Sequence, residues 1–595
     1  MRPLPYAQPL APHDQSGSRR LHEGEQRQTQ PVTEAKKMGK SVAWVGILMS
    51  ASLLLGCGGG GHLPTSVPNF PSNAPLPASR LTAAEVAQIV ERAARAANDN
   101  TMVIAVVDRA GRVLGLFKKA NAPDTYTTTN GQTFSPEAVA VALARTAAFF
   151  SHDQAPLSSR TVRYISGRHF PPGVQNTPNG ALWGIEHTNR GFVREDNPAG
   201  LVLPDFTGWL EPLVGMVTGK ADLADTDATA VNPGGVPIYK NGHCVGGIGV
   251  TVGSAGIPSA APSRADYERN MAIAEWAAFH GAFGDDPTQF LGAFLQTLPP
   301  PKFVVVDGIA LPFVRNTQPP AGVMPDGSGF PTPMGKWVVD PATNPSIGQP
   351  LPDEMGVQDA NGAYLLGPIA ADLNADGNPT MAEVNAIVQA CIAIANRTRA
   401  VIRLPVGSRC RFVFAIAVPD TPPNPPRVVA VYRMRDATMF SVDVAVTKAV
   451  NMVHFNTVEG QEELGLRTHR SGQPWALTNR TLNFGSQPFY PPGIDGSAPG
   501  PFFNLFQDDF SNPGTQGGGR GIVWFAGSVP LYRNGVLVGG LGVSGDGVEQ
   551  DDYVAVLGNP NGFPGYEPPV DRRIDNLVLN GVRLPWLKFP RNPEG

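Results

Sequence analysis

One short stretch of the sequence carries oxygen side chains at the spacing of a calcium-binding loop. Residues 372–383 read DLNADGNPTMAE and fit the pattern D-x-[DN]-x-[DN]-G-x5-E at every defined position. Ca²⁺ takes about six to eight oxygen ligands, and a glycine at the sixth position permits the sharp turn between them. We therefore predict a structural calcium site, with the ligands Asp372, Asn374, Asp376, Asn378 and Glu383.

The same stretch has a competing interpretation. Thr380 and Glu383 have the spacing of a capping box, in which a hydroxyl and a carboxylate satisfy the free N–H groups at the start of a helix. The pattern recurs at Thr82 and Glu85, where no calcium loop precedes it. Pro379 also stands where such a loop usually has an apolar residue. The sequence leaves both interpretations open.

A stretch with paired glycines occurs twice, as GVPIYKNGHCVGGIGV in residues 235–250 and SVPLYRNGVLVGGLGV in residues 528–543. Each copy predicts a β-hairpin, because an apolar run ends at an Asn-Gly pair that tolerates the positive φ of a type I′ turn. The second strand then contains paired glycines, which have no side chains, so that another backbone or a flat ligand could come close at these positions. The residues concerned are Gly246, Gly247, Gly539 and Gly540.

The elements around the two hairpins repeat in the same order. A capped helix, an apolar strand pair, a second helix, a long insertion, the glycine hairpin and, in the first copy, a closing helix are predicted. This pattern indicates an α/β (α+β) fold in two modules, each an antiparallel sheet flanked by helices. We place module 1 at residues 81–314, a Pro/Gly-rich linker at 315–371 and module 2 at 372–595.

The insertions, residues 151–233 and 458–526, also resemble each other. Arg160 and Thr161 in the first correspond to Arg480 and Thr481 in the second. A repeated arginine could bind an anionic ligand or brace the insertion, and we favour the brace. After the second hairpin, Glu549, Asp551 and Asp552 could form a catalytic cluster, but we favour a solvated helix N-terminus, where negative charge suits the helix dipole.

The order of elements, the hairpin at residues 529–545 and the acidic EQDD at 549–552 resemble the GlcG/HbpS family. The resemblance covers about residues 81–150 with 234–284, and 380–457 with 527–553. It implies a profilin-like fold for both modules, haem or a related small ligand, and homo-oligomers. The family's helix motif A-x-x-K-A-x-T-A is matched in part by Lys448 in module 2 and by Thr146 in module 1, where Ala142 replaces the lysine.

Haem iron needs an axial donor, for which histidine is the commonest choice. His454 stands late in the second helix of module 2, His152 just past the equivalent helix of module 1, and His243 in the first glycine hairpin. These three histidines are the predicted ligands, although a hydrogen-bonded core or surface role competes for each. The resulting hypothesis is a binding protein for haem or a related ligand. A haem-degrading or redox enzyme in the same cleft and a protein-interaction scaffold with closed clefts remain alternatives, and no catalytic residue is assigned.

The N-terminal region has the features of an export signal. Lysines precede an apolar run, residues 42–55, that is too short to span a bilayer, and LLGC at residues 54–57 resembles a lipobox. We therefore predict a signal or upstream segment at residues 1–56, a lipid-bearing Cys57 and a flexible tether at 57–80. The expected location is the bacterial cell envelope, on the periplasmic or extracellular side, with membrane contact through the lipid only.

Composition limits the remaining classes of function. The chain has 595 residues, 42% of them hydrophobic, which is typical of globular proteins, and its formal net charge is −4. A slightly acidic chain is a poor match for nucleic acid, so we predict no nucleic-acid partner.

Overall fold

The computed structural model describes residues 80–127, 133–188, 232–253, 263–284, 303–306, 308–351, 357–369, 377–404, 406–421, 424–511, 515–562 and 566–595. These residues belong to one compact unit, Phe70–Gly595. The predicted signal segment, Cys57, the tether up to residue 79 and the calcium residues Asp372, Asn374 and Asp376 lie outside them. Within the described residues, no helix combines the length and apolarity needed to cross a bilayer.

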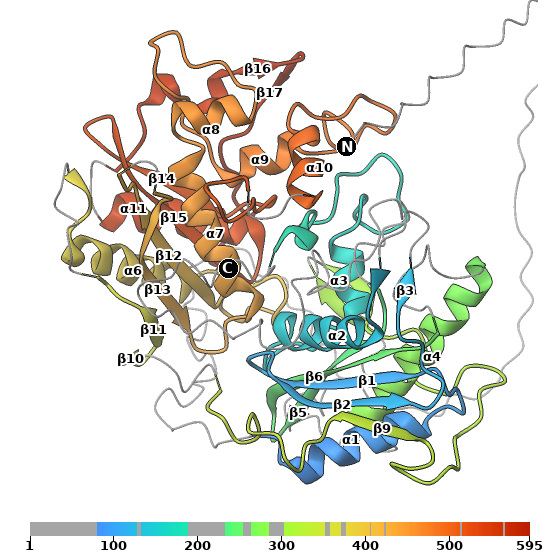
Figure 1. The fold of residues 1–595 in the computed structure, drawn as a ribbon. Helices are drawn as coiled ribbons and strands as arrows, with labels where there is room; N and C mark the ends of the chain where they lie inside the picture. Colours follow the sequence, from blue (N-terminus) through green and yellow to red (C-terminus); the bar gives the residue numbers. More distant parts are fainter. Residues whose placement is uncertain are drawn as a thin grey trace, which may run out of the picture. The chain divides into compact units, whose positions relative to one another are not determined.

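Module 1 contains a five-stranded antiparallel sheet with the strand order β5-β6-β1-β2-β9 (Figure 1). Its larger elements are α1 (Ala83–Arg95), β1 (Val103–Asp108), β2 (Val113–Lys119), α2 (Pro136–Phe150), α3 (Ser159–Ile165), β5 (Gly235–Lys240), β6 (His243–Thr251) and α4 (Arg264–Phe283). Shorter elements are β3 (Tyr126–Thr127), β4 (Thr133–Phe134), η1 (Ile185–His187), β7 (Phe303–Val306) and β8 (Ile309–Pro312).

Module 2 contains a six-stranded sheet with the order β10-β11-β13-β12-β15-β14 (Figure 1). Its larger elements are α6 (Met381–Ala395), β12 (Phe412–Val418), β13 (Arg427–Met434), α7 (Phe440–His454), α8 (Val458–Glu463), α9 (Asn479–Gly485), α10 (Phe503–Ser511), β14 (Ser528–Arg533), β15 (Val536–Gly545) and α11 (Val548–Gly562). The chain ends with η7 (Val570–Arg572), η8 (Ile574–Asn576), β16 (Val578–Leu579) and β17 (Val582–Arg583).

The two sheets have the same strand order in their four shared strands. In module 1 Gly249 pairs with Ala105 on one side and Gly235 on the other, and in module 2 Gly542 pairs with Ala415 and Ser528 in the same way. The predicted fold class, antiparallel sheets flanked by helices, is therefore confirmed. The Asn-Gly turns of both glycine hairpins have positive φ at each residue, as a type I′ turn requires.

The predicted linker contains regular structure. β9 (Gly335–Val339) joins the outer edge of β2, and β11 (Gly362–Leu366) joins the outer edge of β13. β10 (Val357–Gln358) then pairs with β11. The sequence did not predict these strands, because they are short and lie between turns in a Pro/Gly-rich segment.

Helices cover both faces of each sheet (Figure 1). In module 1, α2 packs on β6, β1 and β5, while α1 and α4 pack together on the other face. Alternation along β6 explains this arrangement, because Gly247 and Gly249 face α2 whereas the Ile248 side chain lies near Gly281 of α4. In module 2, α7 takes the place of α2, and the pair α6 and α11 takes that of α1 and α4.

The predicted glycine wall faces protein backbone rather than an open space. A Cβ on Gly247 would lie 2.3 Å from the Ala144 carbonyl oxygen of α2, and one on Gly540 would lie 2.4 Å from the Ala449 carbonyl oxygen of α7. At Gly246 and Gly539 the nearest atoms are carbonyl oxygens of the neighbouring strands. The expectation that a flat ligand approaches these glycines is therefore corrected, because helix and strand backbones occupy that space.

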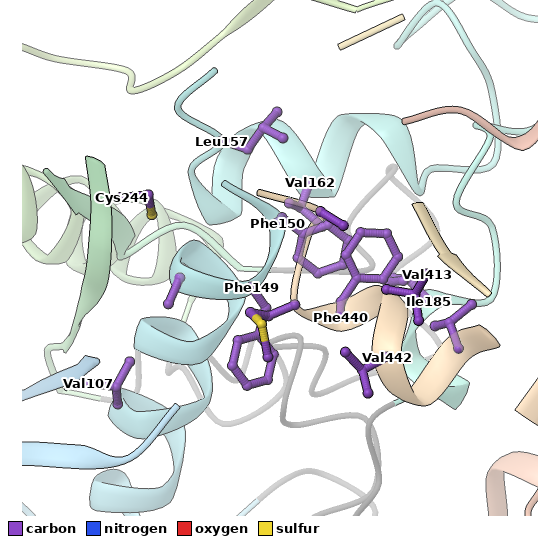
Figure 2. Close-up of a cluster of buried hydrophobic side chains, with 14 of the residues drawn as sticks. Val107, Phe149, Phe150, Leu157, Val162, Ile185, Cys244, Val413, Phe440 and Val442 are labelled. Atoms are coloured by element: carbon purple, nitrogen blue, oxygen red, sulfur yellow. The ribbon is translucent and has the colours of Figure 1, made fainter. Parts of the chain in front are cut away.

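The two modules meet where α2 ends and α7 begins. The Phe150 and Phe440 rings stack with centroids 4.2 Å apart, and Figure 2 shows the two rings side by side among buried aliphatic side chains. The Met439 N–H donates to the Phe149 carbonyl oxygen at 3.0 Å. One hydrophobic core runs through both modules.

Candidate functional site

A cavity of about 1050 Å³ is lined by residues of both modules. Small-molecule sites usually enclose about 300–1,000 Å³, so this cavity would hold a large ligand. Most of its wall is apolar. Aromatic side chains come from the end of α2, the start of α7, the two insertions and the segment before β14, and they are Phe150, Phe440, Phe170, Phe484 and Phe525. The first turn of α11 contributes polar residues to the wall, among them Glu549, Gln550 and Asp551.

The polar wall contains a buried ion pair. Asp551 of α11 lines the cavity, and its Oδ2 accepts a hydrogen bond from Lys448 Nζ at 3.0 Å. The same ammonium donates to the Val543 carbonyl oxygen at 2.8 Å and lies 5.1 Å from the centre of the Phe525 ring. Asp551 Oδ1 is buried and has no hydrogen-bond partner among the described residues. One residue of the cavity wall thus has a buried acceptor oxygen without a donor among the described residues.

Burial shifts the titration of both members of this pair. It raises the pKa of the Asp551 carboxyl to about 7, against the opposing effect of Lys448. It also lowers the pKa of the Lys448 amine. Both shifts have the same cause, since the interior disfavours charge on either group. A carboxyl that can exchange a proton near neutral pH is therefore part of the cavity wall.

A second buried pair lies one residue further along α11. Arg480 of α9 donates to Asp552 Oδ2 at 2.8 Å, and in module 1 Arg160 of α3 donates to Glu275 Oε1 of α4 at 2.6 Å. The repeated arginines therefore brace the insertions against the closing helices, as expected from the sequence. Asp551 and Asp552 are only 2% and 0% exposed, so the prediction of a solvated acidic helix start was wrong for both.

The Lys448–Asp551 pair has no counterpart in module 1. A Cβ on Gly527 would meet Asp551, Lys448 and the Val543 carbonyl oxygen, whereas one on the equivalent Gly234 would meet Ala274, Leu143 and the Val250 carbonyl oxygen. Leu143, and not Ala142 as the sequence motif suggested, therefore occupies the lysine position. Both members of the polar pair are replaced by apolar residues in module 1.

Two arginines at the edge of the cavity have no acidic partner among the described residues. Arg399 donates to the backbone carbonyl oxygens of Arg591 and Asn592, and Arg591 lies on the same wall. Lys588, by contrast, pairs with Glu549 at 2.5 Å. The cavity therefore combines apolar walls with cationic groups that would attract an acidic ligand.

None of the three predicted haem ligands is among the described residues that line this cavity. His454 Nε2 is 2.5 Å from Glu463 Oε2, and His243 Nδ1 is 2.6 Å from Asp153 Oδ2. His152 is fully buried, and its Nδ1 accepts hydrogen bonds from the backbone N–H groups of residues 154 and 155. Its Nε2 therefore carries the proton and lies 3.9 Å from Asp546 Oδ1. Each imidazole thus has a hydrogen-bonding or ionic neighbour within the protein.

The remaining predicted residues have structural contacts. The Thr146 hydroxyl donates to the Ala142 carbonyl oxygen at 2.8 Å inside α2. Glu383 completes a capping box with Thr380 and also pairs with Arg533 at 2.7 Å. The described residues contain no group of three or more His, Cys, Asp or Glu side chains placed to hold a metal. Since three calcium residues lie outside the described ranges, the calcium site stays a prediction.

Comparison with known proteins identifies the module that carries this site. The model of the family described as "Haem degrading protein HbpS-like" matches residues 412–559. The chain is also similar to a solved PduOC–heme complex, at 20% identity over 32% of this chain and 100% of that chain, with a TM-score of 0.21. The chain is similar to protein ORFY of Klebsiella pneumoniae as well, at 18% identity over 33% of this chain and 98% of that chain, with a TM-score of 0.21.

A double mutant of HbpS from Streptomyces reticuli gives 14% identity over 33% of this chain and 94% of that chain, with a TM-score of 0.20. No curated protein matches this chain. The family match spans β12 to α11, and so includes Lys448, Asp551 and the glycine hairpin. Residues 412–559 therefore form a GlcG/HbpS-like module.

Proposed function

We propose that this protein binds haem or a related tetrapyrrole in the cavity beside α11. The observation that carries the proposal is the cavity of about 1050 Å³, whose apolar walls are joined by Arg399 and Arg591 at the edge. A flat macrocycle would contact the aromatic side chains, and its propionates would pair with the arginines. The match of residues 412–559 to the HbpS-like family supports the same ligand class.

The donor set of the cavity limits how haem would be held. The described residues that line the cavity include no histidine, cysteine, methionine or tyrosine, which are the usual protein donors to haem iron. Recognition therefore rests on the macrocycle and its carboxylates, and the protein supplies no usual axial ligand from this wall. Metal-free protoporphyrin should consequently bind about as well as hemin.

Absorbance and fluorescence titrations with these two molecules test the proposal. Saturable binding of both by the full chain is expected. Ala181→Trp should weaken both, because Ala181 is exposed on the cavity wall and an indole there would narrow it. Ala342→Trp, at an exposed alanine outside the lining, is the matched control. Equal binding by the two variants, or no saturable binding by the unaltered chain, would contradict the proposal.

A haem-degrading activity is the second candidate, and the name of the matching family model favours it. It would require a reductant, and the described residues of the cavity wall provide no redox group. Incubation of the hemin-loaded protein with a reductant and oxygen separates the candidates. Linear tetrapyrrole products indicate the enzyme, an unchanged Soret band indicates a binding protein, and no hemin uptake indicates an interaction scaffold.

We also propose that the protein is a lipoprotein of the cell envelope, anchored through Cys57. The support is the lysine-rich start, the short apolar run and the lipobox-like LLGC of residues 54–57. Growth with a clickable fatty acid should label the full chain, and Cys57→Ser should abolish the label and release the protein from the membrane fraction. Equal labelling of both forms would exclude Cys57 as the lipidated residue.

A further inference from the structure

Both members of the Lys448–Asp551 ion pair are replaced in module 1, by Leu143 and Ala274. In module 2 a buried cation and a buried carboxylate face each other beside Gly527, and in module 1 two apolar side chains occupy the same positions beside Gly234. Removing one member of a buried ion pair leaves an uncompensated charge, whereas replacing both by apolar groups is often tolerated. Module 1 therefore shows that this fold accepts the apolar version of the pair.

The closing helix of module 1 starts earlier than that of module 2. α4 begins ten residues before Ala274, whereas α11 begins three residues before the equivalent Asp551, so α4 is longer by about two turns at its start. These extra turns bury Tyr267, whose hydroxyl donates to Asn232 at 2.6 Å. Met271 is buried on the following turn, where its sulfur accepts from Arg163 at 3.6 Å.

Module 1 nevertheless contributes to the cavity of module 2. Phe150, Leu157, Ile165 and Leu182 line that cavity, and the stacking of Phe150 on Phe440 fixes one side of it. The cavity is thus lined by apolar residues of both modules and by Asp551 of module 2. Its two sides are not equivalent, although the sheets behind them have the same strand order.

We infer that, within the part of the chain that the structure describes, module 2 alone provides the ligand site, and that Asp551, held by Lys448, is its polar anchor. The inference rests on the proposed function. The ligand class is a flat apolar molecule that carries carboxyl groups. One carboxyl of the ligand meets the carboxyl of Asp551, whose Oδ1 has no donor among the described residues, and shares one proton with it, while module 1 closes the opposite side as a partner that binds no ligand.

Hemin titration of the full chain tests the stoichiometry, and a double variant tests the anchor. The unaltered chain should bind one hemin. Lys448→Leu combined with Asp551→Ala copies the module 1 pair, and it should lower hemin affinity by about tenfold or more, as expected for loss of a hydrogen bond to a charged group. Its circular dichroism should stay unchanged. Leu143→Met, a volume-conserving change at the equivalent position of module 1, should leave affinity unchanged.

Two further measurements keep the inference testable if the double variant folds poorly. Hemin dimethyl ester has no free carboxyl, so it loses the contacts to Asp551 and to the arginines, and its affinity for the unaltered chain should fall at least to that of hemin for the double variant. Asp551→Asn preserves the shape of the side chain and should reduce the difference in affinity between hemin and the ester. Binding of two hemins per chain, or full affinity in both Asp551 variants, would overturn the inference alone. A chain that binds no hemin would overturn the proposed function as well.

Discussion

Lys448 Nζ lies 3.0 Å from Asp551 Oδ2, and neither side chain is more than 3% exposed. The pair lies beneath Phe525, between the second helix of module 2 and the first turn of α11. The charge of each residue offsets the cost of burying the other. The two residues should therefore behave as a unit.

Stability measurements on single and double variants test this unit. Lys448→Leu should destabilise the fold by about 3–5 kcal/mol, because it leaves the Asp551 carboxylate buried without its cation. Adding Asp551→Ala should recover most of that loss, since the apolar pair already fits module 1. Urea unfolding of the three proteins checks the result. Additive losses in the double variant would mean that the two residues act independently.

The pKa of Asp551 predicts a pH dependence of stability. The folded protein raises this pKa from 3.8 to about 7, so that between about pH 4 and pH 7 the folded state binds a proton that the unfolded state has released. The contribution of Asp551 to stability is therefore largest below pH 4 and is lost as the pH rises towards 7. Asp551→Asn cannot titrate, so its free energy of unfolding, followed from pH 4.5 to 7.5, should fall less with rising pH than that of the unaltered chain. Parallel curves would contradict the raised pKa.

The glycines of the second hairpin predict a packing effect. Gly540→Ala would place a Cβ 2.4 Å from the Ala449 carbonyl oxygen, so α7 must move away from the sheet. Overpacking of this kind typically costs about 1–3 kcal/mol. Gly327→Ala is the control, because a Cβ at Gly327 has no heavy atom within 4 Å. Thermal unfolding should show a lower Tm for the first variant only, and equal Tm values would contradict the close approach of α7.

The three histidines predicted as haem donors provide a further test. Since His152, His243 and His454 are absent from the cavity lining and each has a hydrogen-bonding or ionic neighbour, their alanine variants should retain hemin affinity. The position of the Soret band should also stay the same in each variant. Loss of that band in one of them would identify that residue as an axial ligand and place the haem elsewhere.

The sequence predicted the fold well because its signals are local. The capping boxes at Thr82 and Thr380, the Asn-Gly turns and the apolar strand pairs each depend on residues close together in the chain, and all appear in the structure. The strands β9 and β11 escaped prediction because each is short and gains its stability from pairing with a distant strand.

The candidate site was harder to predict than the fold. Lys448 was identified from a motif, but its partner Asp551 was interpreted as solvated, because acidic residues at a helix start usually face water. The burial of Asp551 involves parts of the chain that are distant in sequence, since its neighbours include Lys448 of α7 and the backbone at Gly527. The glycines were identified correctly as places of close approach, yet only the structure shows that a helix fills the space beside Gly540.

The connector between the modules affects how each half could be produced on its own. β9 covers one side of β2, and Trp337 on β9 packs edge-on against Phe117 at a centroid distance of 5.4 Å. A fragment ending at residue 314 would keep β2 paired with β1, but it would leave the backbone groups on the outer edge of β2 unpaired and remove Trp337 from Phe117. Such a fragment would be prone to aggregate through that strand, so a soluble first half must extend beyond Val339.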